Sequence, residues 1–340
     1  MSQKRILNVL KYLVFLGIGF GLLWFVTRNQ DLTRMKNELM GARWNWVILS
    51  MSVAILSHVF RAARWNMLIN TMGFSTKLTT TFHATMSGYF ANLIVPRLGE
   101  VTRCGILARK NGIPIQGLLG TVIVERGLDL LSLMLITLFT ILFQIGILSD
   151  FLNQNLFDPL QQRVADNTSF IWLALGGAVV LLVASGYLIK RSMHRMRQRG
   201  GGLFFKLKRI WVGFTGGMKT IKRMKNKGLF ILYTLLIWVC YYLMVYLCFF
   251  ALDATEHLSV GAGFTTLAMG SLGIVAPVPG GMGTYHYIVS LTLTEIYLVA
   301  ESSAVSFAYL VHSSQTLVIL VVGAISLFLL TIKSKTLKAS

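Results

Sequence analysis

The sequence predicts an all-α integral membrane protein, a polytopic helical bundle that contains two re-entrant pairs of broken helices. Hydrophobic residues make up 55% of the 340 residues and charged residues only 13%, with a mean hydropathy of +0.67. A soluble domain carries about 25% charged residues. Apolar windows of about 18 or more residues recur along the chain, as spans across a ~30 Å hydrocarbon core require. Two Pro/Gly breaks interrupt apolar segments in opposite halves, and this pattern favours an inverted repeat.

The first apolar run, at about 6–26, follows the basic start MSQKRILNVLK. A secretory signal peptide begins in the same way, but this run is long and ends in TRNQD without an A-x-A site. We therefore expect a retained first helix with its N-terminus in the cytoplasm, followed by a polar segment of mixed charge at 28–43.

A second span is expected at 44–69, where Trp44 and Trp46 form an interfacial aromatic pair at the start of the helix. Its last turns carry Arg61 and Arg64, which lie three residues apart and therefore share a helix face. Two interpretations remain open: these arginines extend to lipid phosphates at the cytoplasmic surface, or they line the entrance of a site.

The next segment, 79–95, is rich in Thr, Ser, Gly and Asn, and it stops at Pro96. It is too polar for a helix that faces lipid. We expect the first half of a re-entrant pair entered from the cytoplasm, with Pro96 and Gly99 at the break and a second short helix at 100–110. Irregular backbone at membrane depth is tolerated only when it is buried in protein or lines a cavity.

Charge sets the topology of the middle of the chain. A span is expected within 115–148, followed by an outer loop at 149–169 and a returning span at 170–189. Residues 190–227 hold thirteen Lys or Arg and no acidic residue, which indicates a cytoplasmic loop lying against anionic lipid. Within it, 203–224 has the aromatic and basic pattern of an interfacial amphipathic helix.

Between residues 228 and 332 the chain contains no Lys or Arg, whereas the tail after it is basic. An even number of crossings is therefore expected, with spans at 229–252 and 303–332. Between them, segments at 258–276 and 285–299 are separated by the break PVPGGMG, which predicts a second re-entrant pair entered from outside.

These elements divide the chain into three parts. We expect an N-terminal membrane half at 1–190, a basic cytoplasmic loop at 191–227 and a C-terminal membrane half at 228–340. Six full spans and two re-entrant pairs are expected; counting every helical segment gives eight as the alternative. The protein is placed in a bacterial cytoplasmic membrane with both termini inside; the two halves share little residue identity, so the inverted repeat rests on topology alone.

Composition and motifs argue against several functions. The net charge of +20 comes from short basic segments between apolar runs, which indicates anionic lipid rather than nucleic acid. The cysteines Cys104, Cys240 and Cys248 have no spacing typical of a disulfide framework or zinc site. No GxSxG, HExxH or nucleotide-binding motif is present. We therefore expect no enzyme activity, cofactor or metal.

Charged residues are concentrated in the stretch 92–129. Six of them are expected at membrane depth: Arg97, Glu100, Arg103, Glu125, Arg126 and Asp129. A charge at the bilayer centre costs roughly 2.5–3.5 kcal/mol, so six unpaired charges would cost about 15–21 kcal/mol. Net domain stability is only about 5–15 kcal/mol. The charges must therefore neutralise one another or line a wet cavity, and such a cluster is a candidate site.

The spacing of these charges leaves several roles open. Glu125 and Asp129 are four residues apart and share a helix face with Arg126 nearby. A proton relay, a cation site and a clamp for a zwitterionic headgroup all fit, as does a structural ion-pair network to Arg97 and Arg103. If a lipid phosphate enters, these two arginines are its natural bidentate partners.

The second break combines helix-ending prolines with glycines that allow close approach. Its expected hinge residues are Pro277, Pro279, Gly280, Gly281 and Gly283. A Gly-rich turn before a helix N-terminus can bind phosphate through backbone N–H groups, but no GK[ST] follows, so this is not a P-loop. His286 is the titratable group of this break, and its role, structural or functional, stays open.

With NLIVPRLGEVTR, VERGLD and PVPGGMGTYH, the chain resembles the lysylphosphatidylglycerol synthase transmembrane family over about residues 5–332. These flippase-like membrane domains also form the N-terminal half of multiple peptide resistance proteins. The resemblance implies lipid translocation through a central cavity where two re-entrant elements meet. The resemblance implies that the family's site residues correspond here to the six charged residues expected at membrane depth and to Pro279, Gly280, Gly281 and Gly283.

The sequence departs from the family in two respects. His286 stands where the family often has an acidic residue, so shared ion coupling does not follow. Only a short polar tail follows residue 332 in place of the soluble aminoacyl transferase domain, and we expect no synthesis of a lysyl-lipid.

The favoured function is movement of a phospholipid, glycolipid or polyprenyl-linked lipid between leaflets, with Arg64 and His286 added to the cavity residues. The expected partners are lipids with anionic or phosphate-bearing headgroups, a second copy of the chain, and enzymes of envelope-lipid biosynthesis. The alternative is a non-transporting scaffold that binds lipid or such an enzyme. An intramembrane lipid-modifying enzyme is a third possibility.

Overall fold

The computed structural model describes residues 3–95, 97–146, 224, 226–276 and 278–336. The chain divides into two units, one of residues 1–143 with 217–340 and one of residues 144–216. The second unit lies almost wholly outside the described residues, so the first is described here by itself. Several predictions fall outside the described residues: the outer loop, the span at 170–189, most of the basic loop with its amphipathic helix, Pro96 and Pro277.

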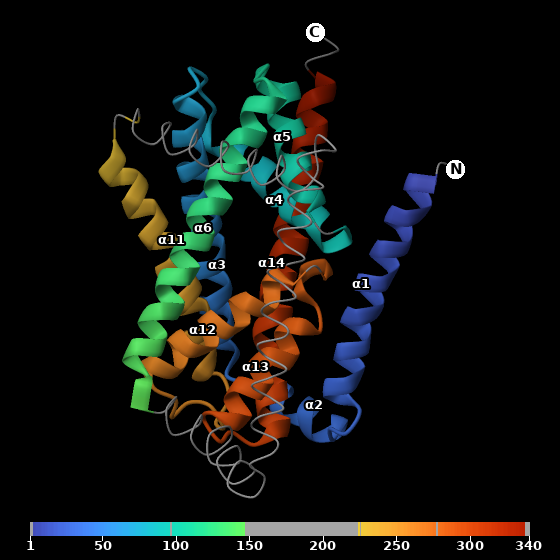
Figure 1. Cartoon of the computed structure of the whole chain (residues 1–340), viewed down its shortest axis with the longest axis vertical. Helices are drawn as coiled ribbons and strands as arrows, with labels where there is room; N and C mark the ends of the chain where they lie inside the picture. The colour runs from blue at the N-terminus through green and yellow to red at the C-terminus, as the bar shows by residue number, and fades with distance from the viewer. Residues whose placement is uncertain (1–2, 96, 147–223, 225, 277, 337–340) are drawn as a thin grey trace, which may run out of the picture. The chain divides into compact units, whose positions relative to one another are not determined.

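All secondary structure in the described ranges is helical, which confirms the predicted all-α class (Figure 1). The helices are α1 Gln3–Thr27, α2 Leu32–Met40, α3 Trp44–Asn70, α4 Leu78–Ile94, α5 Leu98–Asn111, α6 Ile115–Phe143, α11 Lys227–Phe249, α12 Val260–Val275, α13 Thr284–Glu295 and α14 Glu301–Thr336, with a 3-10 turn η2 at Pro279–Gly281. Within the described part, α3, α6, α11 and α14 are long and apolar enough to cross a membrane.

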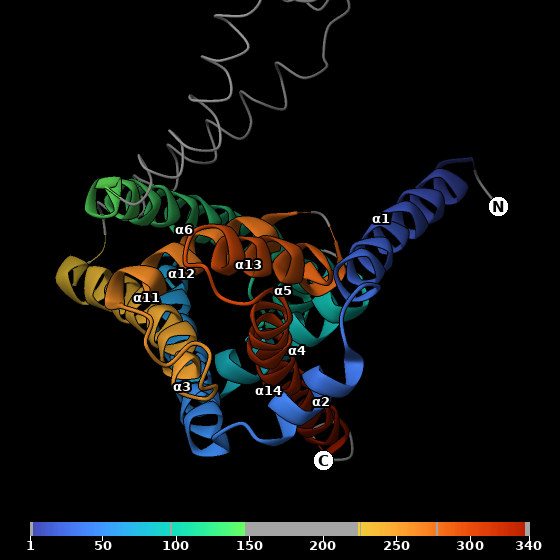
Figure 2. The same ribbon diagram turned by 90° about the horizontal axis from the view of Figure 1, so that it is seen from below.

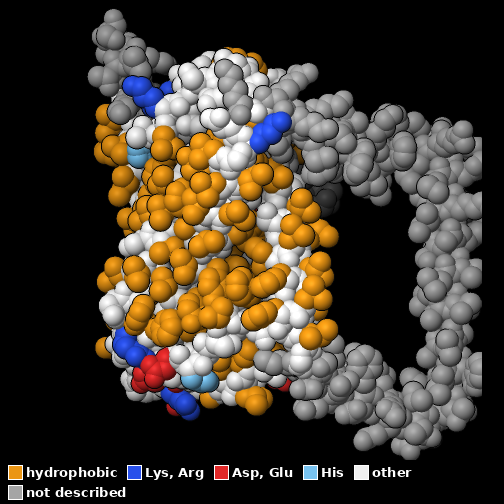
Figure 3. Space-filling view, turned by 90° about the vertical axis from the view of Figure 1, so that its left-hand side faces the viewer, with side chains coloured by type: hydrophobic (Ala, Val, Ile, Leu, Met, Phe, Trp, Pro, Cys, Tyr) orange, Lys and Arg blue, Asp and Glu red, His pale blue; other side chains and the backbone are white. Residues whose placement is uncertain are grey.

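On the face shown in Figure 3, apolar side chains cover most of the surface between the two ends of this unit, and charged side chains gather toward the ends. On α6, Leu130, Met134 and Leu138 are each more than half exposed. Contiguous exposed apolar surface on this scale is rare on soluble proteins and marks contact with lipid or another apolar surface. The chain is therefore a multi-pass membrane protein.

The helices pack through small residues. α3 lies along α11, α4 packs against α5 and α14, and α12 and α13 pack on each other (Figures 1 and 2). Where α4 crosses α5, Gly88 faces Gly99: a Cβ added to either one would run into the backbone oxygen of the other. On α14, a Cβ on Gly323 would lie 2.7 Å from the Cβ of Phe90. Small residues at helix crossings allow the close approach that drives association in membranes.

A short helix, α2, forms in the segment that the sequence identified only as polar. Its N-cap is Asp31, whose carboxylate accepts hydrogen bonds from the backbone N–H of Thr33 at 2.9 Å and of Arg34 at 3.0 Å. Such a cap stabilises a helix start by about 1 kcal/mol. The buried Met35 packs with Val26 of α1 and Val305 of α14, so tertiary contacts hold this helix in place.

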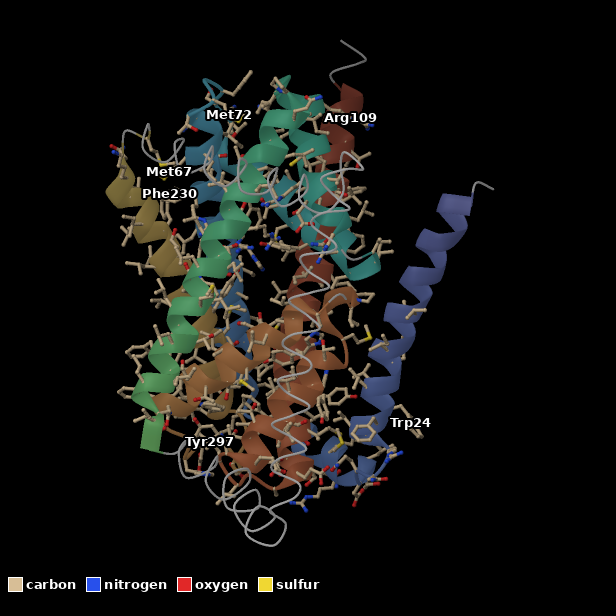
Figure 4. All side chains as sticks on the ribbon, viewed as in Figure 1. Trp24, Met67, Met72, Arg109, Phe230 and Tyr297 are labelled. Carbon is tan, nitrogen blue, oxygen red and sulfur yellow. The ribbon has the colours of Figure 1, made fainter. Side chains whose placement is uncertain are left out.

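The two ends of the unit differ in charge. Trp24 and Tyr297 lie at one end and Met72 and Arg109 at the other (Figure 4). The first end carries both acidic and basic residues, and Arg43 there pairs with Asp253 at 2.9 Å and with Glu256. The charged residues of the second end, among those described, are basic and include Lys77, Arg109, Lys110 and Lys227. The unit therefore has one mixed end and one basic end.

The crossing of α4 and α5 allows a test of the packing. Substitution Gly99→Ala is expected to lower the free energy of unfolding by about 1–3 kcal/mol, because the added methyl group overlaps the backbone of Gly88. The matched control is Gly105→Ala on the same helix, where a Cβ meets nothing within 4 Å. Thermal unfolding in detergent should show a lower midpoint for the first variant, and an unchanged or slightly raised midpoint for the control. Equal midpoints would contradict this packing.

Candidate functional site

A cavity of about 570 Å³, partly open to the outside, lies among α3, α4, α5, α6, α11, α12, α13, α14 and the breaks between the paired helices. Its volume is within the range of ~300–1,000 Å³ typical of small-molecule sites. The charged residues that line it are Arg61, Arg97, Glu100, Arg126 and Asp129. Helices from both membrane halves therefore meet around a single charged chamber.

A network of ion pairs forms part of the cavity wall and continues behind it. Asp129 on α6 accepts hydrogen bonds from Arg61 at 2.5 Å and from Arg64 at 2.6 Å, both on α3. One turn earlier, Glu125 accepts from Arg103 of α5 at 2.9 Å, and its second oxygen lies 3.6 and 3.7 Å from Arg61 and Arg64. The side chain of Glu125 is fully buried and that of Asp129 is 13% exposed. The spacing of four residues places both carboxylates toward α3 and α5.

Further contacts fix the positions of these arginines. The guanidinium of Arg103 lies 4.4 Å from the ring centroid of Trp65, a cation–π contact. The indole N–H of Trp65 donates to Thr121 of α6 at 2.9 Å. Arg61 donates to the hydroxyl of Tyr89 on α4 at 2.5 Å. Helices α3, α4, α5 and α6 are thus joined by polar contacts in the interior.

The part of the cluster nearest the cavity opening is less buried. Arg126 pairs with Glu100 at 3.0 Å and lies 4.0 Å from Asp129, and its side chain is 42% exposed. Arg97 is exposed, lines the cavity and has no ion-pair partner among the described residues. It precedes α5 with φ of 66°, a left-handed conformation that non-glycine residues rarely adopt. The oxygen of Asn92 accepts from the N–H of Gly99 at 2.6 Å and holds this turn to α4.

The second break is held by two histidines. The ring of His312 on α14 is hydrogen-bonded through Nε2 to the carbonyl of Gly280 at 2.9 Å, so Nε2 carries the proton. Nδ1 of His286 accepts from the N–H of Gly283 at 3.3 Å. The ring centroids lie 4.7 Å apart. Gly280 has a φ of 61°, which a glycine adopts without strain. The polar ring atoms therefore satisfy the backbone of the turn.

The two breaks approach each other. A Cβ on Gly280 would lie 3.3 Å from the side chain of Leu93, near the end of α4. On another side, Gly283 packs so closely on Gly19 of α1 that an added Cβ would run into the backbone oxygen of Gly19. Arg97 and Gly280 both line the cavity. The cavity is thus bordered by both interrupted helix pairs.

The structure separates the predicted site residues into three groups. Those that line the cavity are Arg97, Glu100, Arg126, Asp129, Gly280 and Gly281. Those that lie behind its wall, in the ion-pair network, are Arg64, Arg103 and Glu125. Those that only support the breaks are Gly99, Pro279, Gly283 and His286.

Two expectations are corrected by this arrangement. Arg61 and Arg64 do not extend to the surface, because their side chains are only 5% and 0% exposed and both bind Asp129. Of the two, Arg61 lines the cavity and Arg64 does not. Arg64 therefore reaches the cavity only through Asp129. His286 does not line the cavity either; the neighbouring His312, on α14, lines it instead.

The uncharged polar wall of the cavity was missed by the sequence analysis. Several lining residues have a buried polar atom without a hydrogen-bond partner among the described residues: His58, Trp238, Thr266, Tyr285 and Gln315. They come from five different helices, α3, α11, α12, α13 and α14, each of which is largely apolar and carries other polar residues as well. Counting the polar residues in each span could have singled these residues out, but it would not have shown that they lie around one cavity.

The described part of the chain is thus a helical membrane protein with a charged cavity. Residues 8–323 match the family described as Lysylphosphatidylglycerol synthase TM region. The chain belongs to this family, which confirms the resemblance found in the sequence.

Two curated relatives are UPF0104 membrane proteins of Methanocaldococcus jannaschii. MJ1595 is 30% identical over 138 residues, which are 40% of this chain and 41% of that protein. MJ1078 is 25% identical over 199 residues, which are 58% of this chain and 76% of that protein. The match to the first relative thus spans less than half of its length. No solved structure matches the chain.

The ion-pair network predicts a large effect of removing one buried charge. Substitution Glu125→Gln is expected to lower the free energy of unfolding by about 3–5 kcal/mol, because it leaves the buried arginine Arg103 without its carboxylate. The control is Glu256→Gln at the exposed pair with Arg43, where a change within about 1 kcal/mol is expected. Thermal unfolding in detergent measures both, and a Glu125→Gln protein as stable as its control would contradict the structural role.

Proposed function

We propose that this protein is a flippase-like transporter that moves a phosphate-bearing lipid between the two leaflets. The observation that carries the proposal is a cavity, set among membrane helices, that holds partly exposed arginines. Intramembrane charge of this kind is costly and is retained mainly along substrate pathways. Membership of the family supports a lipid-related role.

The proposed transport path uses two re-entrant helix pairs. In each pair, α4 with α5 and α12 with α13, two short helices pack against each other across a break. We infer that α4 and α5 enter the membrane from the basic end and that α12 and α13 enter from the mixed end (Figure 1). Broken helices that enter from opposite sides and meet near the midplane are the arrangement of inverted-repeat transporters.

The charge difference between the ends supports an orientation. Cytoplasmic loops carry an excess of Lys and Arg. The end with Lys77, Arg109, Lys110 and Lys227 is therefore proposed to face the cytoplasm. Both termini would lie on that side, as expected from the sequence.

In the proposed mechanism the arginines near the opening bind the phosphate. Arg97 and Arg126 supply charge-assisted donors, whose planar geometry suits phosphate oxygens. Glu100 and Asp129 hold Arg126 in position at 3.0 and 4.0 Å. The break at Gly280 and Gly281 would act as the hinge that changes access.

Lipid movement in liposomes tests this proposal. The protein is reconstituted with fluorescent phospholipids of different headgroups, and loss of signal to a membrane-impermeant quencher reports transfer between leaflets. Substitutions Arg97→Ala and Arg126→Ala are each expected to slow transfer about tenfold or more, since a charge-assisted hydrogen bond contributes about 1.5–3 kcal/mol.

The matched control is Arg109→Ala, which removes an exposed arginine from the far end of the same helix α5. It should transfer lipid at the wild-type rate. If the wild-type protein moves no lipid of any headgroup, the non-transporting scaffold is the better description.

A further inference from the structure

We propose that the cavity selects headgroups that carry a dianionic phosphate, a terminal phosphomonoester or a diphosphate, over monoanionic phosphodiesters. This inference rests on the proposed function, because it names the lipid class that the same cavity takes. It follows from the charge balance of the cluster, from where the surplus charge lies, and from the surface around the opening.

The cluster holds more positive than negative charge. Its arginines are Arg61, Arg64, Arg97, Arg103 and Arg126, and its carboxylates are Glu100, Glu125 and Asp129. Five arginines against three carboxylates leave a surplus of two positive charges when the histidines are counted as neutral. No other charged residue lines the described wall of the cavity.

One of the two surplus charges lies at the opening, where Arg97 and Arg126 face Glu100; the other belongs to the buried set of three arginines and two carboxylates, which reaches the cavity wall at Arg61. The buried carboxylates Glu125 and Asp129 are each within hydrogen-bond reach of an arginine. Arg126 has a salt-bridge partner in Glu100 but stays 42% exposed, and Arg97 has none among the described residues. Uncompensated charge at membrane depth is costly, so a ligand that neutralises it gains binding energy. A dianion neutralises the surplus fully and a monoanion only half of it.

The oxygens of a terminal phosphate also suit two arginines better. A phosphodiester offers two unesterified oxygens, whereas a terminal phosphate offers three. Each arginine can bind two oxygens with its planar fork. A terminal phosphate can therefore bind Arg97 and Arg126 through two oxygens each, with one of its three oxygens shared between them. A phosphodiester has enough unesterified oxygens for only one such two-oxygen contact.

The surroundings of the opening indicate a lipid rather than a soluble phosphate. Leu130 of α6 and Ile274 and Val275 of α12 line the cavity, yet are 55%, 53% and 62% exposed. In a membrane these residues face acyl chains. A headgroup between the arginines would thus leave its hydrocarbon chains along α6 and α12, still in lipid.

Binding measurements on the purified full chain test the inference. Native mass spectrometry in detergent at pH 8 compares dioleoyl phosphatidic acid with dioleoyl phosphatidylglycerol, which share acyl chains but differ in phosphate charge. The second ionisation of a phosphomonoester has a pKa of about 6, so phosphatidic acid is close to dianionic there. We expect it to bind about tenfold more tightly, and lysyl-phosphatidylglycerol, with a net positive charge, to bind most weakly.

Charge variants test the cause. Arg97→Gln or Arg126→Gln lowers the surplus to one and should reduce the preference for phosphatidic acid to threefold or less, while Arg109→Gln keeps it at about tenfold. Glu100→Gln raises the surplus to three and should strengthen phosphatidic acid binding, a gain that a purely structural role does not predict. A loss of that preference in Glu100→Gln would overturn the inference.

The outcomes separate this inference from the proposed function. Equal affinity of the wild type for the two phospholipids would overturn the selectivity and leave lipid transport standing. Failure to bind any phospholipid would overturn both. Glycerol 3-phosphate serves as the soluble counterpart, and binding as tight as that of phosphatidic acid would overturn the lipid part of the inference.

Discussion

The binding of three buried arginines by two carboxylates on one face of α6 is the interaction on which this structure depends. Glu125 and Asp129 draw together α3 and α5, which otherwise present guanidinium groups to a low-dielectric interior. Each ion alone would be costly to bury, and the pairs offset that cost only because the geometry is close. The same ion pairs form part of the wall of the cavity, so they both stabilise the helix packing and shape the candidate site.

The network divides into a structural and an accessible part. Arg64, Arg103 and Glu125 are sealed from the cavity and stabilise the helices around it. Arg97 and Arg126 remain exposed at its opening. This division explains how one cluster can be rigid and still leave charge for a ligand. It also means that the number of charges in the sequence overstates the number that a ligand in the cavity can contact.

Much of the fold could be predicted because membrane helices depend on local apolar runs: the helix expected at 79–95 is Leu78–Ile94 in the structure. The charged stretch was also predictable, since the cost of burying charge demands partners. The rest depends on tertiary contacts. Arg61 and Arg64 lie more than 60 residues from Asp129, so spacing could not choose their role. Helix α2 depends on packing of Met35 against Val305, which no local pattern reveals.

None of the described side chains of α1 lines the cavity, yet the backbone of this helix at Gly19 meets the backbone of the second break at Met282 and Gly283. With no side chain between them, the two segments cannot slide independently without opening a gap or colliding. Any movement of that break would therefore also move α1. The amino-terminal helix is thereby coupled to the second break, and a restraint placed on α1 would limit movement of that break from outside the cavity.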